Sequence, residues 1–413
     1  MGSLITHAGT FSVDDRIASP WHYLPVEVPP GTGALRVTLS YPRDSEAVLD
    51  LGCFDPAGFR GWSGGARGSF VVAERGATPG YLAGPVTAGL WQVVIGLYVV
   101  PVEGVPFTVT AEPIAAGSAA LDGQLATWLA TASAPPVPSA RPARRPLPAD
   151  AGLTWLAGDL HAHTFHSDGV MSVAELAAHA VKRGLDFVAV TDHNTVSHHA
   201  LLGPASSRYG VTLLPGQEVT TELGHAGVLG DTGWVDFREP ASSWLSAAEA
   251  AGGLMSVNHP FAGPVSWVHP MPRRPPLLEV WHWSWLDLSW TTPLSWWQAW
   301  DPSAIPVGGS DWHRPGSDAP LGTPTTWVCC ADASVTGVLE GLRAGRVAIS
   351  ASRDGAVLLR QGDSLVAVGA DGLVLAGPAG PYKRILGDLV RLPGASGYQR
   401  LLTPTGATVA LTP

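Results

Sequence analysis

The sequence predicts a mixed α/β protein in which an all-β, sandwich-like domain precedes a barrel of alternating strands and helices. Three features carry this prediction: short apolar runs without a helical period early in the chain, a segment dense in Pro, Ala and Arg at residues 134–150, and repeated strand–helix patterns after it. The chain has 413 residues, and domains commonly hold about 100–200 residues, so we expect two or three domains.

The N-terminal region, residues 1–133, has the pattern of an antiparallel β domain. Short runs rich in Val, Leu, Tyr and Phe are separated by Gly and Pro clusters, as in 34–41, 69–73, 89–100 and 106–111. The composition of residues 134–150 favours an extended, semi-rigid linker. We therefore expect a domain boundary there.

Residues 151–352 alternate between strand and helix patterns. A strand candidate at 155–160 is followed by a helix candidate at 172–183, which ends at Gly184. Further strand candidates are 186–191, 211–214, 225–229, 254–257, 277–281 and 305–308, and further helix candidates are 243–251, 293–300 and 335–344. This many βα units predict a parallel sheet that closes into a barrel. A further strand candidate is 347–351. Residues 353–413, with strand candidates at 356–359 and 372–375, are expected to form a small β-rich tail.

Charge and composition exclude several function classes. The formal net charge of −10 disfavours a nucleic-acid partner, because binding phosphates without sequence preference needs a basic surface. The longest apolar run, residues 89–102, is too short for a membrane-spanning helix, so we expect no membrane partner. Three cysteines and the absence of a signal-peptide pattern favour a reducing, cytoplasmic location. A homo-oligomer is an open alternative.

Histidines and carboxylates gather at the predicted strand ends. Twelve of the 14 histidines fall between His161 and His313. In parallel barrels the loops after the strands form one face, so these side chains should converge. The candidate metal ligands are His161, His163, Asp168, His193, Glu218, His225, His259, Asp311 and His313. A set of imidazoles and carboxylates without thiolates suits two or three divalent ions of Zn, Mn or Fe.

Six motifs in order resemble a known family. They are GDLHAHTFHSDG at 158–169, VTDHN at 190–194, PGQEVT at 215–220, GHAGVLG at 224–230, NHP at 258–260 and GGSDWH at 308–313. Together they resemble the polymerase and histidinol phosphatase (PHP) domain over residues 155–352. The extended PGQEVT and GHAGVLG pattern is similar to the CehA/McbA branch of PHP metallohydrolases.

The resemblance implies a distorted (β/α)7-type PHP barrel with a dinuclear or trinuclear metal centre. By motif, His161, His163, Glu218 and Asp311 would hold one metal, and Glu218 would bridge to a second metal held by His225 and His259. Asp168, His193 and His313 would hold a third. A metal-bridging hydroxide would attack the ester, and Glu218, Asp311 and His193 are the residues expected to be catalytic. The implied activity is hydrolysis of a small-molecule ester, foremost a phosphoester.

Two alternatives stay open. The first is a carbamate or carboxylic ester hydrolase acting on an aromatic substrate, and the second is a non-catalytic, metal-containing binding protein. The amidohydrolase barrel, which also begins with His-x-His, is disfavoured because its usual carbamylated lysine has no counterpart. The two lysines, Lys182 and Lys383, lie on a helix and near the C-terminus.

Candidate substrate contacts follow the strand at 277–281. Seven of the 17 tryptophans lie between Trp281 and Trp300, and Trp281, Trp283 and Trp285 alternate. An extended chain would place these three on one aromatic face. The side chains predicted to bind substrate are Arg314, Trp281, Trp283 and His282. Arg314 is the candidate clamp for a phosphate or carboxylate.

Overall fold

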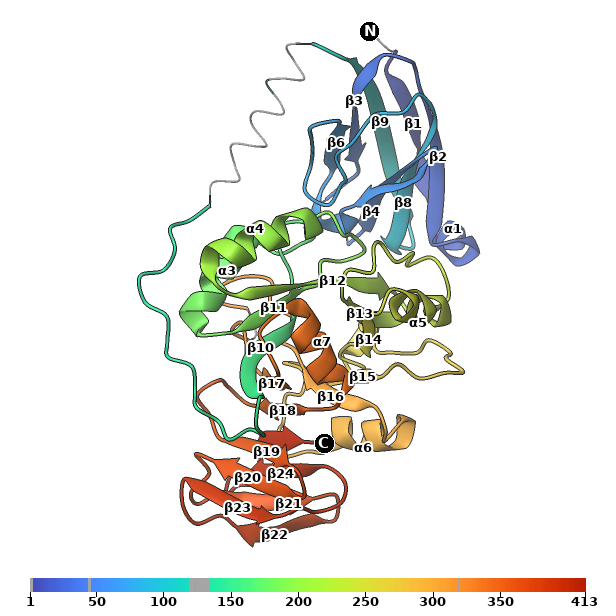
Figure 1. Cartoon of the computed structure of the whole chain (residues 1–413). Coiled ribbons are helices and arrows are strands. Elements are labelled where there is room, and N and C mark those ends of the chain that lie inside the picture. Colours follow the sequence, from blue (N-terminus) through green and yellow to red (C-terminus); the bar gives the residue numbers. More distant parts are fainter. Residues whose placement is uncertain (1–2, 44–45, 119–122, 124–133, 318) are drawn as a thin grey trace. The chain divides into compact units, whose positions relative to one another are not determined.

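The structure, a computed structural model, describes residues 3–43, 46–118, 123, 134–317 and 319–413 (Figure 1). The chain forms two compact units. The first comprises residues 1–134, 165–172 and 192–198, and the second comprises 135–164, 173–191 and 199–413. The predicted mixed α/β class is confirmed, and the N-terminal region is β-rich. No helix in the described part of the chain is long and apolar enough to cross a membrane.

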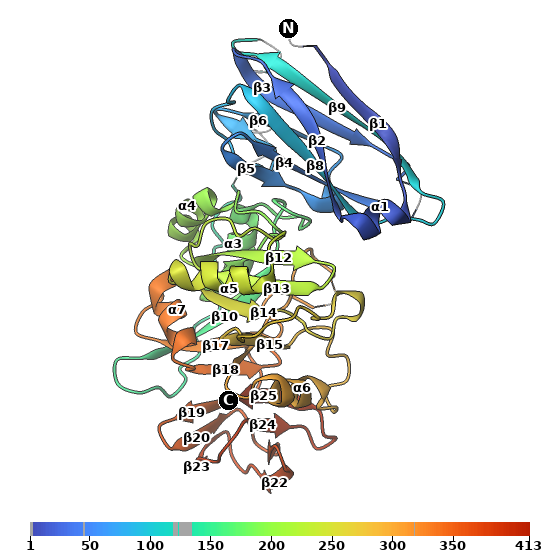
Figure 2. The same cartoon turned by 90° about the vertical axis from the view of Figure 1, so that its right-hand side faces the viewer.

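The first unit contains two antiparallel sheets. One sheet has the strand order β1-β9-β3-β6-β7, and the other has the order β2-β8-β4-β5 (Figure 2). The strands are β1 Ile5–Phe11, β2 Trp21–Val28, β3 Thr32–Ser40, β4 Val48–Asp55, β5 Gly58–Trp62, β6 Ser69–Ala73, β7 Gly76–Ala77, β8 Gly89–Val99 and β9 Val105–Ala115. Inward-facing side chains from both sheets, including Leu35, Phe70, Trp91 and Ile95, form one buried cluster. The pattern of short apolar runs thus corresponds to a sandwich core.

A short helix, α1 (Val13–Ala18), joins β1 to β2 and was not predicted. Ser12 caps it: the Ser12 side chain accepts a hydrogen bond from the Asp15 N–H, and the Asp15 side chain accepts one from the Ser12 N–H. A single 3-10 turn at Gly64–Ala66 follows β5. None of the helix residues of α1 is buried, so no apolar helical period marks the segment in the sequence.

Seven strands of the second unit form the predicted barrel. Their order is β16-β15-β14-β13-β12-β11-β10. The bounds are β10 Thr154–Ala162, β11 Phe187–Val190, β12 Thr212–Thr221, β13 Gly224–Leu229, β14 Leu254–Val257, β15 Leu277–Trp281 and β16 Ile305–Gly308. Every residue of β11, β13, β14 and β15 is buried, which explains why these strands are mostly apolar in sequence.

The barrel departs from a purely parallel arrangement at β13. This strand pairs antiparallel with both β12 and β14, whereas the pairs β10·β11, β11·β12, β14·β15 and β15·β16 are parallel. Only Glu222 and Leu223 separate β12 from β13. A parallel crossover needs a dozen or more residues, so two residues allow only a hairpin.

The barrel closes where the chain after β16 returns to β10. Trp312 forms an isolated parallel bridge with Ala162. The His163 N–H donates to the Trp312 carbonyl at 2.9 Å, and the Trp312 N–H donates to the His161 carbonyl at 3.3 Å. The residues that follow the first and the last barrel strands are therefore hydrogen-bonded side by side.

Helices cover the barrel strands on the outside. They are α3 Val173–Arg183, α4 His199–Tyr209, α5 Ala241–Ala250, α6 Thr292–Trp300 and α7 Val335–Arg343, with a 3-10 turn at Gly263–Val265. Helix α4 packs on β12, α5 on β13 and β14, and α6 on β15, while α3 packs beside α4 (Figure 1). Gly184 ends α3 with a φ of +72°, a conformation that glycine adopts without steric cost.

The C-terminal strands extend the same sheet beyond β10. Strands β17 (Thr325–Cys330) and β18 (Val347–Ser350) pair antiparallel in succession, and β25 (Thr408–Thr412) pairs with β18. The sheet continues through β24 Gln399–Leu402, β21 Val374–Gly377 and β22 Gly380–Arg384, while β19 Val357–Gln361, β20 Ser364–Val368 and β23 Leu389–Pro393 form a separate three-stranded sheet. Their buried side chains form a cluster around Leu358, Leu375 and Leu401.

Residues 135–150 run over the second unit without helix or strand. Arginines tie this segment down. Arg141 and Arg144 both donate to Asp186 Oδ1, at 3.2 and 2.9 Å, and Arg145 donates to the carbonyls of Arg353 and Gly355. The segment predicted as a linker is a strap that binds the barrel through its own arginines.

Candidate metal centre

Seven of the nine predicted ligands belong to the second unit: His161, His163, Glu218, His225, His259, Asp311 and His313. Most lie at or just beyond the carboxyl ends of barrel strands. His225 is at the start of β13, and because β13 runs antiparallel, its first residues lie beside the end of β12. The hairpin therefore brings His225 to the same edge of the sheet as Glu218.

Glu218 is the centre of this group. Its Oε1 lies 3.1 Å from His161 Nε2, 3.1 Å from His259 Nε2 and 3.3 Å from His225 Nδ1. Its Oε2 lies 3.5 Å from His163 Nε2. Glu218 is fully buried, and its one carboxylate contacts four imidazoles. This is the arrangement expected of a carboxylate that bridges two ions.

Asp311, which follows β16, contacts two of the same imidazoles. Its Oδ1 lies 2.9 Å from His163 Nε2 and 3.2 Å from His161 Nε2. The donor atoms of His161, His163, Glu218 and Asp311 all lie within 4.8 Å of one another, close enough to hold one ion. His313 stacks on His163 with ring centroids 4.3 Å apart and hydrogen-bonds the Asp311 carbonyl through Nδ1 at 2.7 Å.

Two carboxylates in the barrel strands were not predicted as site residues. Glu279 in β15 lies with Oε1 3.1 Å from His161 Nδ1, and its Oε2 accepts the His259 N–H at 2.8 Å. Glu279, His161 and His259 form a further group whose donor atoms lie within 4.8 Å. Asp159 in β10 accepts from the N–H groups of His161, Ser310 and Gly322. In the sequence, the available sign of each was a charged residue inside an otherwise largely apolar strand.

The backbone is strained at two of the ligands. His259 has a φ of +25° and Asp311 a φ of +50°, in a region that side chains other than glycine rarely occupy. Such strain costs about 1–3 kcal/mol per residue and persists where the surroundings over-determine it. At His259 the conformation is held by the hydrogen bond from its N–H to Glu279. At Asp311 it is held by the closure of the barrel at the neighbouring Trp312.

The charges of the group are strongly coupled. Burial disfavours the charged form of His161, but the carboxylates of Glu218, Asp311 and Glu279 outweigh burial and raise its pKa well above the usual value. Burial likewise opposes ionisation of Asp311, but His161 and hydrogen bonds from His163 and His282 hold its pKa well below the usual value. The Asp311 carboxylate therefore favours its ionised form, which a nearby positive charge such as a divalent ion would stabilise further.

The residues present fit divalent metal ions. Four nitrogens lie within 3.3 Å of Glu218 Oε1 when Asn258 Nδ2, at 3.0 Å, is included. The donors are imidazole nitrogens and carboxylate oxygens, the ligands of Zn, Mn and Fe in proteins. Glu279 contacts His161 and accepts the His259 N–H, and Asn258 donates to Glu218. Residues around metal ligands commonly support them in this way.

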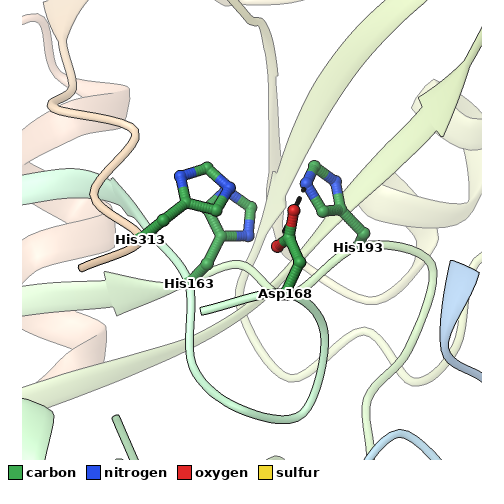
Figure 3. A group of neighbouring side chains, drawn as sticks. All are labelled: His163, Asp168, His193 and His313. Atoms are coloured by element: carbon green, nitrogen blue, oxygen red, sulfur yellow. Dashed lines mark ion pairs between the residues drawn. The ribbon is translucent and has the colours of Figure 1, made fainter. Parts of the chain in front are cut away.

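The other two predicted ligands, Asp168 and His193, lie in the first unit. They face each other, with His193 Nε2 3.6 Å from Asp168 Oδ1. Figure 3 draws this pair together with His163 and His313, which belong to the second unit. That Asp168, His193 and His313 hold a third ion stays a prediction.

The predicted substrate-binding residues follow β15 and β16. His282 is buried, with Nε2 3.4 Å from Asp311 Oδ2, and the ring of Trp283, 37% exposed, lies 5.0 Å from the His282 ring. The expected single aromatic face is not formed. Strand β15 ends at Trp281, and the turn that follows, with the Trp285 N–H bonded to the His282 carbonyl, buries Trp281 and Trp285. Arg314 is exposed beside His313.

Comparison with known proteins identifies the segment that carries this centre. Residues 159–252 match the model of the PHP domain family. This part of the chain is therefore similar to a PHP domain. The segment holds Glu218 and His225 as well as the first His-x-His motif, while His259, Asp311 and His313 follow it in the chain.

Individual proteins are also similar to parts of this chain. A 5'-3' exoribonuclease of Haemophilus influenzae is 34% identical over 70 residues, which is 17% of this chain and 26% of that protein. The match thus spans about a quarter of the length of that relative.

Two solved structures are also similar. A two-domain protein from Bacteroides vulgatus, containing a predicted PHP-like metal-dependent phosphoesterase, is 16% identical with a TM-score of 0.44, covering 66% of this chain and 100% of that one. An amidohydrolase from Chromobacterium violaceum is 18% identical with a TM-score of 0.31, covering 40% of this chain and 89% of that one.

Proposed function

We propose that the chain is a metal-dependent hydrolase of ester bonds, with phosphoesters as the favoured substrate class. One observation carries the proposal: a single buried carboxylate oxygen, Glu218 Oε1, lies within 3.3 Å of nitrogens from three histidines. A carboxylate shared in this way suits a multinuclear site, and multinuclear sites stabilise the attacking and leaving oxygens of a phosphoryl transfer. The PHP match supports the same class.

The proposed site holds two or three ions of Zn, Mn or Fe. His161, His163, Glu218 and Asp311 would hold the first, and Glu218 would share a second with His225 and His259. Asp168 and His193, together with His313, would hold a third. Bound divalent ions would supply Lewis acidity and lower the pKa of a coordinated water.

The residues of the chain have distinct proposed roles. Glu218, Asp311 and His193 would act at the reacting atoms through the metals. Glu279 would orient the His161 imidazole: its Oε1 would accept a hydrogen bond from His161 Nδ1–H, while Nε2 of the same ring faces Glu218. Arg314, exposed beside His313, would bind a phosphate or carboxylate of the substrate.

A carbamate or carboxylic ester with an aromatic group is the second candidate. It is favoured by Trp283, whose partly exposed ring lies against His282, which in turn contacts Asp311. An aromatic substrate group could pack on Trp283 while its ester lies at the metals. The sequence similarity to the CehA/McbA branch agrees with this candidate.

We expect a small molecule rather than a nucleic acid as substrate. The similar protein from Haemophilus influenzae is named as an exoribonuclease, but this chain carries a net charge of −10. A surface of that charge repels a polyanion and leaves only local attraction at the metals.

Assays with reconstituted protein would test the proposal. Chelator-treated protein is loaded with Mn²⁺ or Zn²⁺ and given 4-nitrophenyl phosphate, bis(4-nitrophenyl) phosphate and 1-naphthyl acetate. Turnover of either phosphoester only in the loaded protein supports the first candidate, and turnover of the naphthyl ester alone supports the second. Loaded protein that turns over none of these substrates would instead favour a non-catalytic binding protein.

A further inference from the structure

Two loops of the PHP segment pack with the N-terminal β-sandwich. Residues 165–172 and 192–198 belong to the first compact unit, although the chain reaches them only after β10 and β11 of the barrel. The first loop carries Asp168 and the second carries His193. These are the two proposed ligands that the barrel unit itself does not contain.

Arg67 of the sandwich binds the first loop. Its guanidinium donates from Nη1 to the Ser167 carbonyl at 2.9 Å and from Nη2 to the Phe165 carbonyl. Burial lowers the pKa of Arg67, while Tyr81 and the carboxylates of Asp192 and Asp168 act to raise it. The half-buried Arg67 guanidinium thus binds the backbone just before Asp168 and also interacts electrostatically with the Asp168 carboxylate.

Gly80 of the sandwich binds the second loop. The Gly80 N–H donates to Ser197 Oγ at 3.0 Å, and the Gly80 carbonyl accepts from Thr195 Oγ1 at 2.8 Å. Gly80 has a φ of +100°, and a Cβ there would lie 2.9 Å from the His166 carbonyl oxygen. The approach is so close that only glycine fits, which is typical of a built contact and not of an incidental one.

The two loops are also bonded to each other. Asp192 Oδ1 accepts from the N–H and Oγ of Ser167, at 3.0 and 2.7 Å, and Asp192 Oδ2 lies 3.1 Å from His198 Nδ1. His166 Nδ1 lies 2.7 Å from Ser197 Oγ. Because Ser167 and His166 of the first loop bond to Asp192 and Ser197 of the second, a contact to either loop also helps to position the other.

We propose that the N-terminal β-sandwich is a positioning domain for the third metal, in which Arg67 and Gly80 hold the loops that carry Asp168 and His193. The inference rests on the proposed function, because it assumes that these two side chains bind a divalent ion. Without the sandwich contacts, an ion would have to order the two loops as it binds, and its affinity would fall.

The test is metal binding by the full chain with Arg67 replaced. The variants are Arg67→Gln and Arg67→Lys, with Arg36→Gln as the matched control, since Arg36 forms a half-exposed ion pair with Glu112 on the same sandwich. Mn²⁺ is titrated into chelator-treated protein, and bound ions per chain are measured after equilibrium dialysis. We expect the weakest site of Arg67→Gln to bind about tenfold to hundredfold less tightly, with the tighter sites unchanged.

Hydrogen exchange provides a second measurement that needs no metal. We expect faster amide exchange in residues 165–172 and 192–198 of Arg67→Gln than in wild type or Arg36→Gln, with unchanged exchange in the sandwich strands. Arg67→Lys keeps the charge and part of the hydrogen bonding, so both measurements should fall between those of wild type and Arg67→Gln.

The outcomes separate this inference from the proposed function. Wild-type protein that binds no Mn²⁺ overturns the proposed function and the inference with it. Wild-type protein that binds ions and hydrolyses esters, while Arg67→Gln matches Arg36→Gln in metal affinity and loop exchange, overturns the inference alone. Wild-type protein with only two sites also overturns it, and leaves the hydrolase proposal intact.

Discussion

Gly309 lies where any larger residue would collide with the proposed metal centre. A Cβ at this position would be 2.1 Å from Glu279 Oε1 and 2.5 Å from His161 Cβ. We therefore expect Gly309→Ala to displace both side chains and to reduce metal content and ester hydrolysis about tenfold or more. Metal analysis and turnover on the substrate found in the assays above measure this.

Gly203→Ala is the matched control for this substitution. Gly203 lies in α4, and a Cβ there would meet no atom within 4 Å. The control should keep full metal content. No gain in stability is expected from it, because Pro204 follows Gly203 in the helix and disfavours a Cβ there. Wild-type metal content in Gly309→Ala would show that Glu279 does not support the site.

Asp50 makes the stability of the sandwich depend on pH. Burial raises its pKa from 3.8 to about 7, although His193 acts to lower it. Between these values the folded chain holds a proton that the unfolded chain has released, so the free energy of unfolding falls as pH rises, by at most about 1.4 kcal/mol per unit. Asp50→Asn is neutral at every pH and should lose this contribution.

Denaturant unfolding at pH 5 and pH 7.5 measures the effect. We expect the variant to gain stability relative to wild type at pH 7.5, and to gain less or nothing at pH 5. An equal difference between the two proteins at both values would mean that the Asp50 carboxylate is not the group responsible.

The side chains that the barrel brings together around Glu218 were found from the sequence because each follows or begins a recognisable strand. His161, Glu218 and Asp311 lie in motifs whose polar residues interrupt apolar runs. Glu279 and Asp159 were missed because a carboxylate within a strand reads as an exposed position, whereas here both are buried and hydrogen-bonded to ligand backbones. Their partners are distant in the sequence, so only the fold reveals the pairing.

At the scale of elements, the hairpin between β12 and β13 decides the geometry of the site. The sequence predicted both strands but not that β13 runs antiparallel. The connection of two residues was the available signal, because no parallel crossover is that short. Antiparallel pairing is what places His225 Nδ1 3.3 Å from Glu218 Oε1.

The strap over residues 135–150 gives a second prediction at this scale. Removing two of its arginines with Arg141→Ala and Arg144→Ala takes two donors from the buried Asp186 carboxylate, which keeps its hydrogen bond from the Ala157 N–H. We expect a loss of about 1–3 kcal/mol of unfolding free energy. We also expect faster cleavage of residues 135–150 by proteinase K.

Arg391→Ala is the control for the strap, since Arg391 makes an exposed hydrogen bond to Gln361 elsewhere in the same unit. It should change stability by no more than about 0.5 kcal/mol. Equal cleavage of the strap in wild type and in the double variant would contradict the role given to these two ion pairs. The composition of the segment predicted an extended chain, but the carboxylate it binds could be found only from the fold.

At the scale of the whole molecule, the two compact units are interleaved along the chain. Sequence composition marked one boundary near residue 134, and the first unit does end its N-terminal part there. The return of residues 165–172 and 192–198 to that unit leaves no trace in composition. It depends on single contacts, such as those of Arg67 and Gly80, which no local pattern announces.

The central claim is that the chain binds at least two metal ions and that the Glu218 carboxylate bridges two of them. Elemental analysis of metal per chain, in wild type and in Glu218→Gln, tests it most directly, with Glu222→Gln as a control because Glu222 is exposed in the adjoining turn. We expect two or three ions per chain in wild type and in the control, and the loss of at least one in Glu218→Gln. Less than one ion per chain in wild type, or an unchanged metal content in Glu218→Gln, would contradict the account.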